Sequence, residues 1–201
     1  MTRRMAARAV TSFLPASKNE VLDWISSLVK NAMVSGYDCN SLQAVFDQIT
    51  ACFKNLVIRG PFFDDDVSQL QLILKDSFLL FSRTTKPALL LQSAICFIGD
   101  VCYHVSLESP FFVRTIVILL DCLLEPSDDI GRQTLRATCA KYLLRIIIKR
   151  RDLFLEELSI EFSGFIKSLM NDRDIDVRNS VFECLDMAKI LFLRFHLHTI
   201  I

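Results

Sequence analysis

The sequence predicts an all-α chain built as an α-solenoid of about four helix pairs. Apolar residues recur at spacings of three and four through most of the 201 residues, as they do in amphipathic helices. The chain is 52% hydrophobic and has only five glycines and five prolines, which suits long buried helices. Similar segments also return every 46 residues. A period of about 40–47 residues with two helices is typical of helical solenoids.

The clearest copy of the repeat is 171–185, with the sequence NDRDIDVRNSVFECL. Its aspartates lie at or just before a predicted helix start, where carboxylates accept bonds from free N–H groups and complement the helix dipole. Arg178 lies in the first turn of that helix. An apolar face follows at helical spacing, made of Val177, Val181, Cys184, Leu185 and Ala188.

Three earlier segments match this copy in steps of 46 residues. The first step reaches Arg132, with Asp128 and Asp129 before it, and the next two reach Lys86 and Asn40. The preceding helices align at the same step, which predicts equivalent core positions. These columns are Trp24, Leu70, Ile116 and Phe162; Leu28, Leu74, Leu120 and Ile166; and Val21, Val67 and Val113.

Turn and cap signals divide the chain in order. We expect a basic segment or partial helix at 1–16, four repeats at 17–60, 61–106, 107–151 and 152–193, and an apolar tail at 194–201. Ser17 opens an S-x-x-E capping box, and Gly36 is the expected stop of the helix that follows. The second helix of this pair is expected from about 41 to 59. Later helices are expected at about 64–82, 86–105, 109–125 and 129–150, with a break at 171 in the last pair.

Charge and cysteine content favour a reducing compartment, either cytoplasm or nucleus. Basic and acidic residues number 23 each, so no overall field favours nucleic acid. The seven cysteines form no C-x-x-C pair and lie among apolar residues, which favours free buried thiols. The longest apolar stretch, 111–124, is too short to span a bilayer. The arginine-rich, acid-poor segment 1–16 leaves a mitochondrial transit peptide as a minor alternative.

Catalytic motifs are absent from the sequence. There is no phosphate-binding glycine loop, no nucleophile elbow and no H-E-x-x-H zinc motif, and there are only three histidines. We therefore expect a non-catalytic protein without a metal or cofactor. A second possibility is a polyanion or nucleic-acid binder that uses Lys141, Arg145 and Lys149. Their spacing of four residues puts them on one helix face, although a solvated surface explains the spacing equally well.

The aspartate–arginine helix starts and their period resemble those of HEAT-repeat proteins over about 17–193. The resemblance implies a right-handed superhelix whose second helices line the concave face, and a role as a protein-interaction scaffold or adaptor. It also implies a structural ladder between repeats, formed here by Asp128 or Asp129 with Arg132 and by Asp174 with Arg178.

The C-terminal end has almost no polar face after Lys189. A solenoid usually needs a polar cap on its last repeat. We therefore expect Phe192, Phe195 and Leu197 to contact another protein, a second copy of the chain or further repeats. The identity of that partner does not follow from the sequence.

Overall fold

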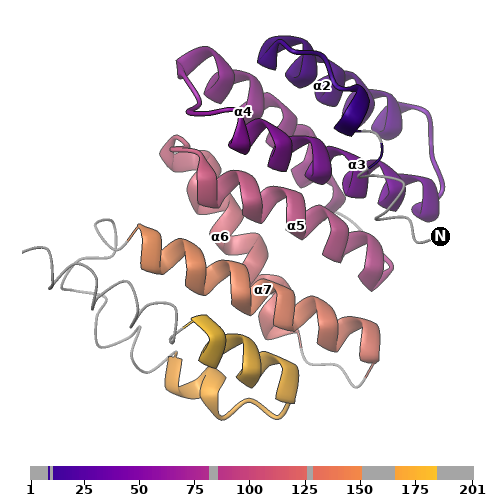
Figure 1. Ribbon diagram of the computed structural model, residues 1–201. Coiled ribbons are helices and arrows are strands. Elements are labelled where there is room, and N and C mark those ends of the chain that lie inside the picture. Colours follow the sequence, from indigo (N-terminus) through magenta and orange to yellow (C-terminus); the bar gives the residue numbers. More distant parts are fainter. Residues whose placement is uncertain (1–8, 10, 82–85, 126–128, 151–165, 185–201) are drawn as a thin grey trace, which may run out of the picture. The chain divides into compact units, whose positions relative to one another are not determined.

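The computed structural model describes residues 9, 11–81, 86–125, 129–150 and 166–184, and all regular elements in them are helices (Figure 1). They are η1 (Thr11–Phe13), α2 (Lys18–Val34), α3 (Cys39–Ile58), α4 (Asp64–Phe78), η2 (Leu79–Phe81), α5 (Ala88–His104), α6 (Ser109–Leu124) and α7 (Ile130–Lys149). Residues 166–170 and 175–184 are helical as well. The prediction of an all-α chain is therefore confirmed for the described residues. The chain divides within α6 into two compact units, Met1–Ile118 and Leu119–Ile201.

Acidic side chains begin several helices, as the sequence predicted. Asp38 and Asp129 are the N-caps of α3 and α7, and each accepts a bond from the N–H three residues later, at 2.8 and 3.0 Å. Asp66 reaches back to the N–H three residues earlier, at 3.0 Å. Each bond occupies an N–H group that has no partner within the helix. Ser17 stands at the N-cap of α2 but its side chain makes no cap bond, so the predicted capping box does not form.

Glycines end the first two long helices. Gly36 follows α2 with φ of 63° and Gly60 follows α3 with φ of 122°. Both angles fall in the region that side chains with a Cβ disfavour, which is why glycine stands there. The predicted repeat boundaries at 60/61 and 106/107 lie in the connections from α3 to α4 and from α5 to α6.

Within residues 11–118, alternate helices pack side by side. α2 contacts α4 and α3 contacts α5, while α2 also contacts its own partner α3 (Figure 1). Side-chain contacts join residues that are 46 apart. Ser93 donates to Asp47 at 2.8 Å, and Lys54 lies 3.3 Å from Asp100. Because the offset stays constant along the helices, α3 and α5 run in the same direction.

Burial of the second helices repeats with a step of 45 residues, one fewer than the sequence matching gave. The same step relates buried positions of α3, α5 and α7. These sets are Val45, Leu90 and Leu135; Ile49, Ala94 and Cys139; Phe53, Ile98 and Leu143; and Leu56, Val101 and Ile146. Phe46 and Phe53 add aromatic contacts to Phe97, with ring centroids 6.4 and 6.1 Å away.

The predicted columns of first helices are correct only in part, because Val21, Leu70 and Leu74 are fully buried as expected but the described positions matched to them are not. Leu70 is fully buried, but Trp24 and Ile116 are only half-buried and Val113 is exposed. The buried equivalents are instead Ile25, Leu70 and Thr115, and then Val29, Leu74 and Leu119. Phe162 lies outside the described residues. One residue rotates a helix position by about 100°, which moves a side chain from the core to its edge.

In the second unit, α7 packs against the segment 166–184. The buried residues there are Leu169, Val177, Val181 and Cys184. Two contacts fix the helix at 175–184 to the middle of α7. Lys141 donates to Glu183 at 3.1 Å, and the Cys184 thiol lies 3.6 Å from the carbonyl oxygen of Lys141.

Candidate interaction surfaces

A groove of about 380 Å³ lies on the face formed by α3 and α5. We call it the second-helix groove. Polar and apolar atoms both line it, and they come from Thr11, Asp47, Thr50, Ala51, Lys54, Asn55, Ile58, Gln92, Ser93 and Cys96. The HEAT resemblance places such second helices on the concave face.

Cross-helix contacts hold the floor of this groove. The Asp47–Ser93 bond and the Lys54–Asp100 pair both bridge α3 and α5. The Lys54 side chain is 59% exposed whereas the Asp100 side chain is 5% exposed, so the lysine presents charge to solvent above a buried carboxylate. Ile58 adds an apolar side chain that is 84% exposed. Such a surface offers both charge signs and an apolar contact to a polypeptide.

A second hollow of about 630 Å³ lies where the α3–α4 connection meets the end of α5. Its walls include Phe62, whose ring stacks on Phe53 at 5.5 Å, and the exposed side chains of His104 and Glu108. Lys18, the first residue of α2, contacts the α3–α4 connection. Its ammonium donates to the Gly60 carbonyl at 3.1 Å and lies 4.9 Å from the centre of the Phe62 ring.

The basic stripe formed by Lys141, Arg145 and Lys149 lies on α7. Lys149 is exposed and the other two are half-buried. Lys141 pairs with Glu183 at 3.1 Å, and the Arg145 guanidinium lies 5.9 Å from the centre of the Tyr142 ring. Glu183 therefore offsets part of the positive charge that the sequence alone attributed to this face.

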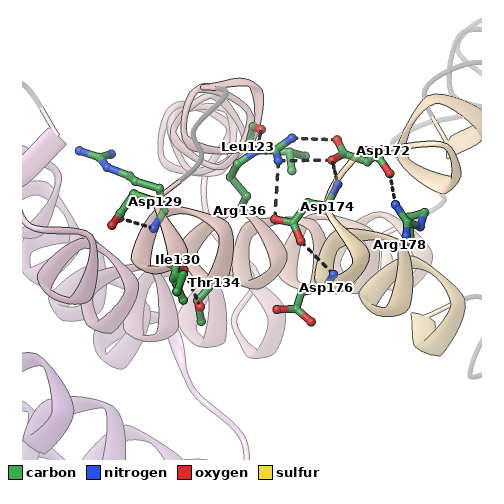
Figure 2. A network of polar contacts seen from close by, with 10 residues as sticks. Leu123, Asp129, Ile130, Thr134, Arg136, Asp172, Asp174, Asp176 and Arg178 are labelled. Carbon is green, nitrogen blue, oxygen red and sulfur yellow. Dashed lines mark hydrogen bonds and ion pairs between the residues drawn. The ribbon is translucent and has the colours of Figure 1, made fainter.

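Arg136 is buried and forms a polar network with residues of the second unit (Figure 2). Its Nε donates to the carbonyl oxygen of Leu123 at 2.9 Å. Its two terminal nitrogens donate to the carboxylate of Asp172, at 2.8 and 3.3 Å, and one lies 3.7 Å from Asp174. A guanidinium from α7 thus joins the end of α6 to the turn at 171–174, with the paired geometry that arginine and carboxylate favour.

The network shifts the acidity of Asp172. Burial alone would raise the pKa of this carboxyl group, but the N–H of Asp174 and the guanidinium of Arg136 donate to it and lower its pKa overall. The folded chain therefore favours the charged form of Asp172. Asp174 in turn accepts a bond from the N–H of Asp176 at 2.9 Å, close to the start of the helix at 175–184.

Contacts are described for each of the four expected ladder residues Asp129, Arg132, Asp174 and Arg178. Asp129 caps α7, and the side chain of Arg132 pairs with Glu125 at 3.0 Å. Asp174 lies beside Arg136, while Arg178 donates to the backbone oxygen of Asp172. Among the described contacts, the bridge from α7 to the turn at 171–174 is made by Arg136, four residues after Arg132.

Sequence matching did not single out Arg136. At the observed step of 45, Arg136 corresponds to Leu91 in α5 and Phe46 in α3, both of which are buried. An arginine at a core position needs carboxylate or carbonyl partners, because burying an unpaired charge is very costly. The sequence feature that could have indicated such partners is the acidic turn at 171–174.

The remaining sequence candidates Phe192, Phe195 and Leu197 lie outside the described residues. In the parts of the chain that the structure describes, no three His, Cys, Asp or Glu side chains gather in a way that could hold a metal ion. No helix among those residues has the length and apolarity needed to cross a membrane.

Comparison of the chain with protein-family models, with curated protein sequences and with solved structures finds no match.

Proposed function

We propose that the chain is a non-catalytic interaction scaffold of HEAT-like helix pairs, which holds another protein against the second-helix groove. The observation that carries this proposal is the same-direction packing of α3 on α5, in which two polar contacts each join residues 46 apart. Stacked equivalent helices of this kind are the building principle of solenoids, whose extended faces bind other proteins.

The second-helix groove supports the choice of binding face. Its floor is held by contacts between α3 and α5, so the lining side chains project from two mutually fixed helices. A fixed surface loses little conformational entropy when a partner binds. Lys54 and Ile58 add an exposed cation and an exposed apolar side chain at its rim.

The polyanion-binding alternative receives less support. It depends on the basic stripe, where Lys141 is already paired with Glu183. The equal numbers of acidic and basic residues also provide no overall attraction for nucleic acid. A catalytic role has no support from the sequence motifs, and we propose none.

The test is affinity capture with the full natural chain and two charge-adding variants. Ala51→Arg places a long cation in the second-helix groove, and Ser27→Arg places the same group on the exposed side of α2. We expect a directly binding protein to be captured by the wild type and by Ser27→Arg but lost with Ala51→Arg. Circular dichroism of both variants controls for folding.

Binding must then be repeated with the purified partner and purified chain. Equal binding by the wild type and Ala51→Arg would show that the groove is not the binding face. The absence of any protein partner, together with steeply salt-sensitive DNA binding, would overturn the scaffold proposal in favour of its alternative.

A further inference from the structure

The segment that precedes α2 folds back along α3. η1 packs on α3, and Thr11 of η1 lines the second-helix groove together with Asn55 and Ile58 of α3. The chain's own residues therefore border the groove that we propose as the binding face. A partner that fills the groove has to contact this segment or displace it.

Arg59, the C-cap of α3, ties the segment to the end of that helix. One terminal nitrogen of its guanidinium donates to the carbonyl oxygens of Pro15 and Ala16, at 2.5 and 3.1 Å. Its Nε donates to the side chain of Asn55 at 2.7 Å, which orients the guanidinium on α3. Because a guanidinium presents several donors in one rigid plane, a single side chain can hold the segment and the helix together.

The segment itself contributes little to the core. None of the residues 11–16 is fully buried, and the side chain of Phe13 is 87% exposed. The helix beneath it contributes Phe53 and Leu56, which are both fully buried. A segment with few buried apolar contacts detaches with a small free-energy change, while the helices under it stay folded.

We propose that residues 11–16 are a detachable strap at the edge of the second-helix groove, with Arg59 as its latch, and that release of the strap widens the groove for a protein partner. The part of this inference that concerns partner binding rests on the proposed function. Detachment itself does not, because it can be measured in the full chain without a partner.

Chymotrypsin measures how often the strap detaches. It cleaves after large apolar and aromatic residues, and Phe13 lies within the strap. Tyr37 lies in the connection from α2 to α3 and gives an internal reference site. Cleavage after Phe13 follows the population of the open strap, because a strap held on α3 does not fit the protease. Mass spectrometry of the intact full chain and its fragments gives the ratio of the two cleavage rates.

Removal of the latch should raise that ratio. In Arg59→Met, two charge-assisted hydrogen bonds to the strap are lost at a partly exposed site, so we expect a rise of about tenfold. Lys75→Met is the matched control. It removes an exposed cation from the last turn of α4 and should leave the ratio unchanged. Circular dichroism establishes that both variants are folded.

The thiol of Cys96 reports access to the groove. Cys96 is half-buried and lines the groove with Thr11, whereas Cys39 is also half-buried but lies at the start of α3, outside the lining residues. We expect iodoacetamide to modify Cys96 faster in Arg59→Met than in the wild type, by up to about tenfold, with Cys39 unchanged. Fragment spectra identify the modified cysteine.

A second variant weakens the strap from its own side. Leu14 is half-buried, and Leu14→Ala leaves α3 unaltered, so this variant gives the test even if Arg59→Met does not fold. It changes the residue that follows the cleaved bond, and its readout is therefore the rate of Cys96 modification, which should also rise.

An unchanged cleavage ratio in folded Arg59→Met would overturn the latch. Faster cleavage without faster Cys96 modification would overturn the role of the strap at the groove. A purified partner should bind Arg59→Met more tightly than the wild type, and equal or weaker binding would show that the strap does not restrict access. If no partner is captured, the scaffold proposal fails, while the rates of cleavage and of Cys96 modification still decide whether the strap detaches.

Discussion

Arg136 and Asp172 form a paired contact in which the two terminal guanidinium nitrogens lie 2.8 and 3.3 Å from the two carboxylate oxygens. The arginine comes from the middle of α7 and the aspartate from the turn before the helix at 175–184. This contact links α7 to the turn at 171–174, and it leads to the first two predictions.

Replacing Arg136 should destabilise the chain far more than replacing Arg132. In Arg136→Met, the buried Asp174 and the Leu123 carbonyl lose their guanidinium partner, which should cost roughly 3 kcal/mol of unfolding free energy. Arg132→Met is the matched control, because its partner Glu125 is largely exposed, and it should cost less than about 1 kcal/mol. Urea unfolding followed by circular dichroism measures both. Similar losses for the two variants would contradict a dominant role for Arg136.

The stabilisation by Asp172 should depend on pH. Its pKa in the folded chain lies below the ordinary value of 3.8, so its contribution is present above the unfolded-state pKa and is lost as pH falls through the folded-state pKa. We expect the unfolding free energy of the wild type to exceed that of Asp172→Asn by a constant amount between about pH 7 and 5, and by less below about pH 4.

Urea unfolding at a series of pH values measures this difference. Asp121→Asn removes an exposed carboxylate from α6 and serves as the control. A wild-type advantage over Asp172→Asn that grows on acidification would have the wrong sign for a carboxyl group with a lowered pKa.

Two leucines of α4 test the observed core register. Leu74 is fully buried and Leu72 is 57% exposed, although both lie in the same helix. Leu74→Ala should lower the unfolding free energy by roughly 2–5 kcal/mol, because it leaves a cavity in the core. Leu72→Ala should change it by less than about 0.5 kcal/mol. Denaturant unfolding compares them, and a larger cost at Leu72 would show that the helix faces the other way.

The basic stripe should bind DNA weakly while Lys141 remains paired. Glu183→Ala removes the partner of Lys141, so we expect tighter binding to a DNA duplex and a salt slope that is steeper by about 1. Glu125→Ala removes an acidic residue from another ion pair, outside the stripe, and should have less effect. Fluorescence anisotropy over a range of salt concentrations measures the slopes. Tight, steeply salt-dependent binding by the wild type would instead favour a polyanion-binding function.

The local features of this chain followed from the sequence, because they depend on neighbouring residues. Apolar spacing predicted the helices, Asp129 marked a helix start, and Gly36 marked a helix end. Their physical basis is the bonding of free N–H groups and the backbone freedom of glycine. The resemblance to HEAT repeats added an expected stacking order and an expected scaffold role, on which the proposed function rests.

Only the tertiary structure decided which residues share a core position and which charges meet. Sequence matching preferred a step of 46 residues, since these helices carry apolar residues on more than one side, whereas burial follows a step of 45. That single residue separates Trp24 from Ile25 in the core of α2. The pairing of Arg136 with Asp172 depends on helix packing, because the two residues are 36 positions apart in the chain.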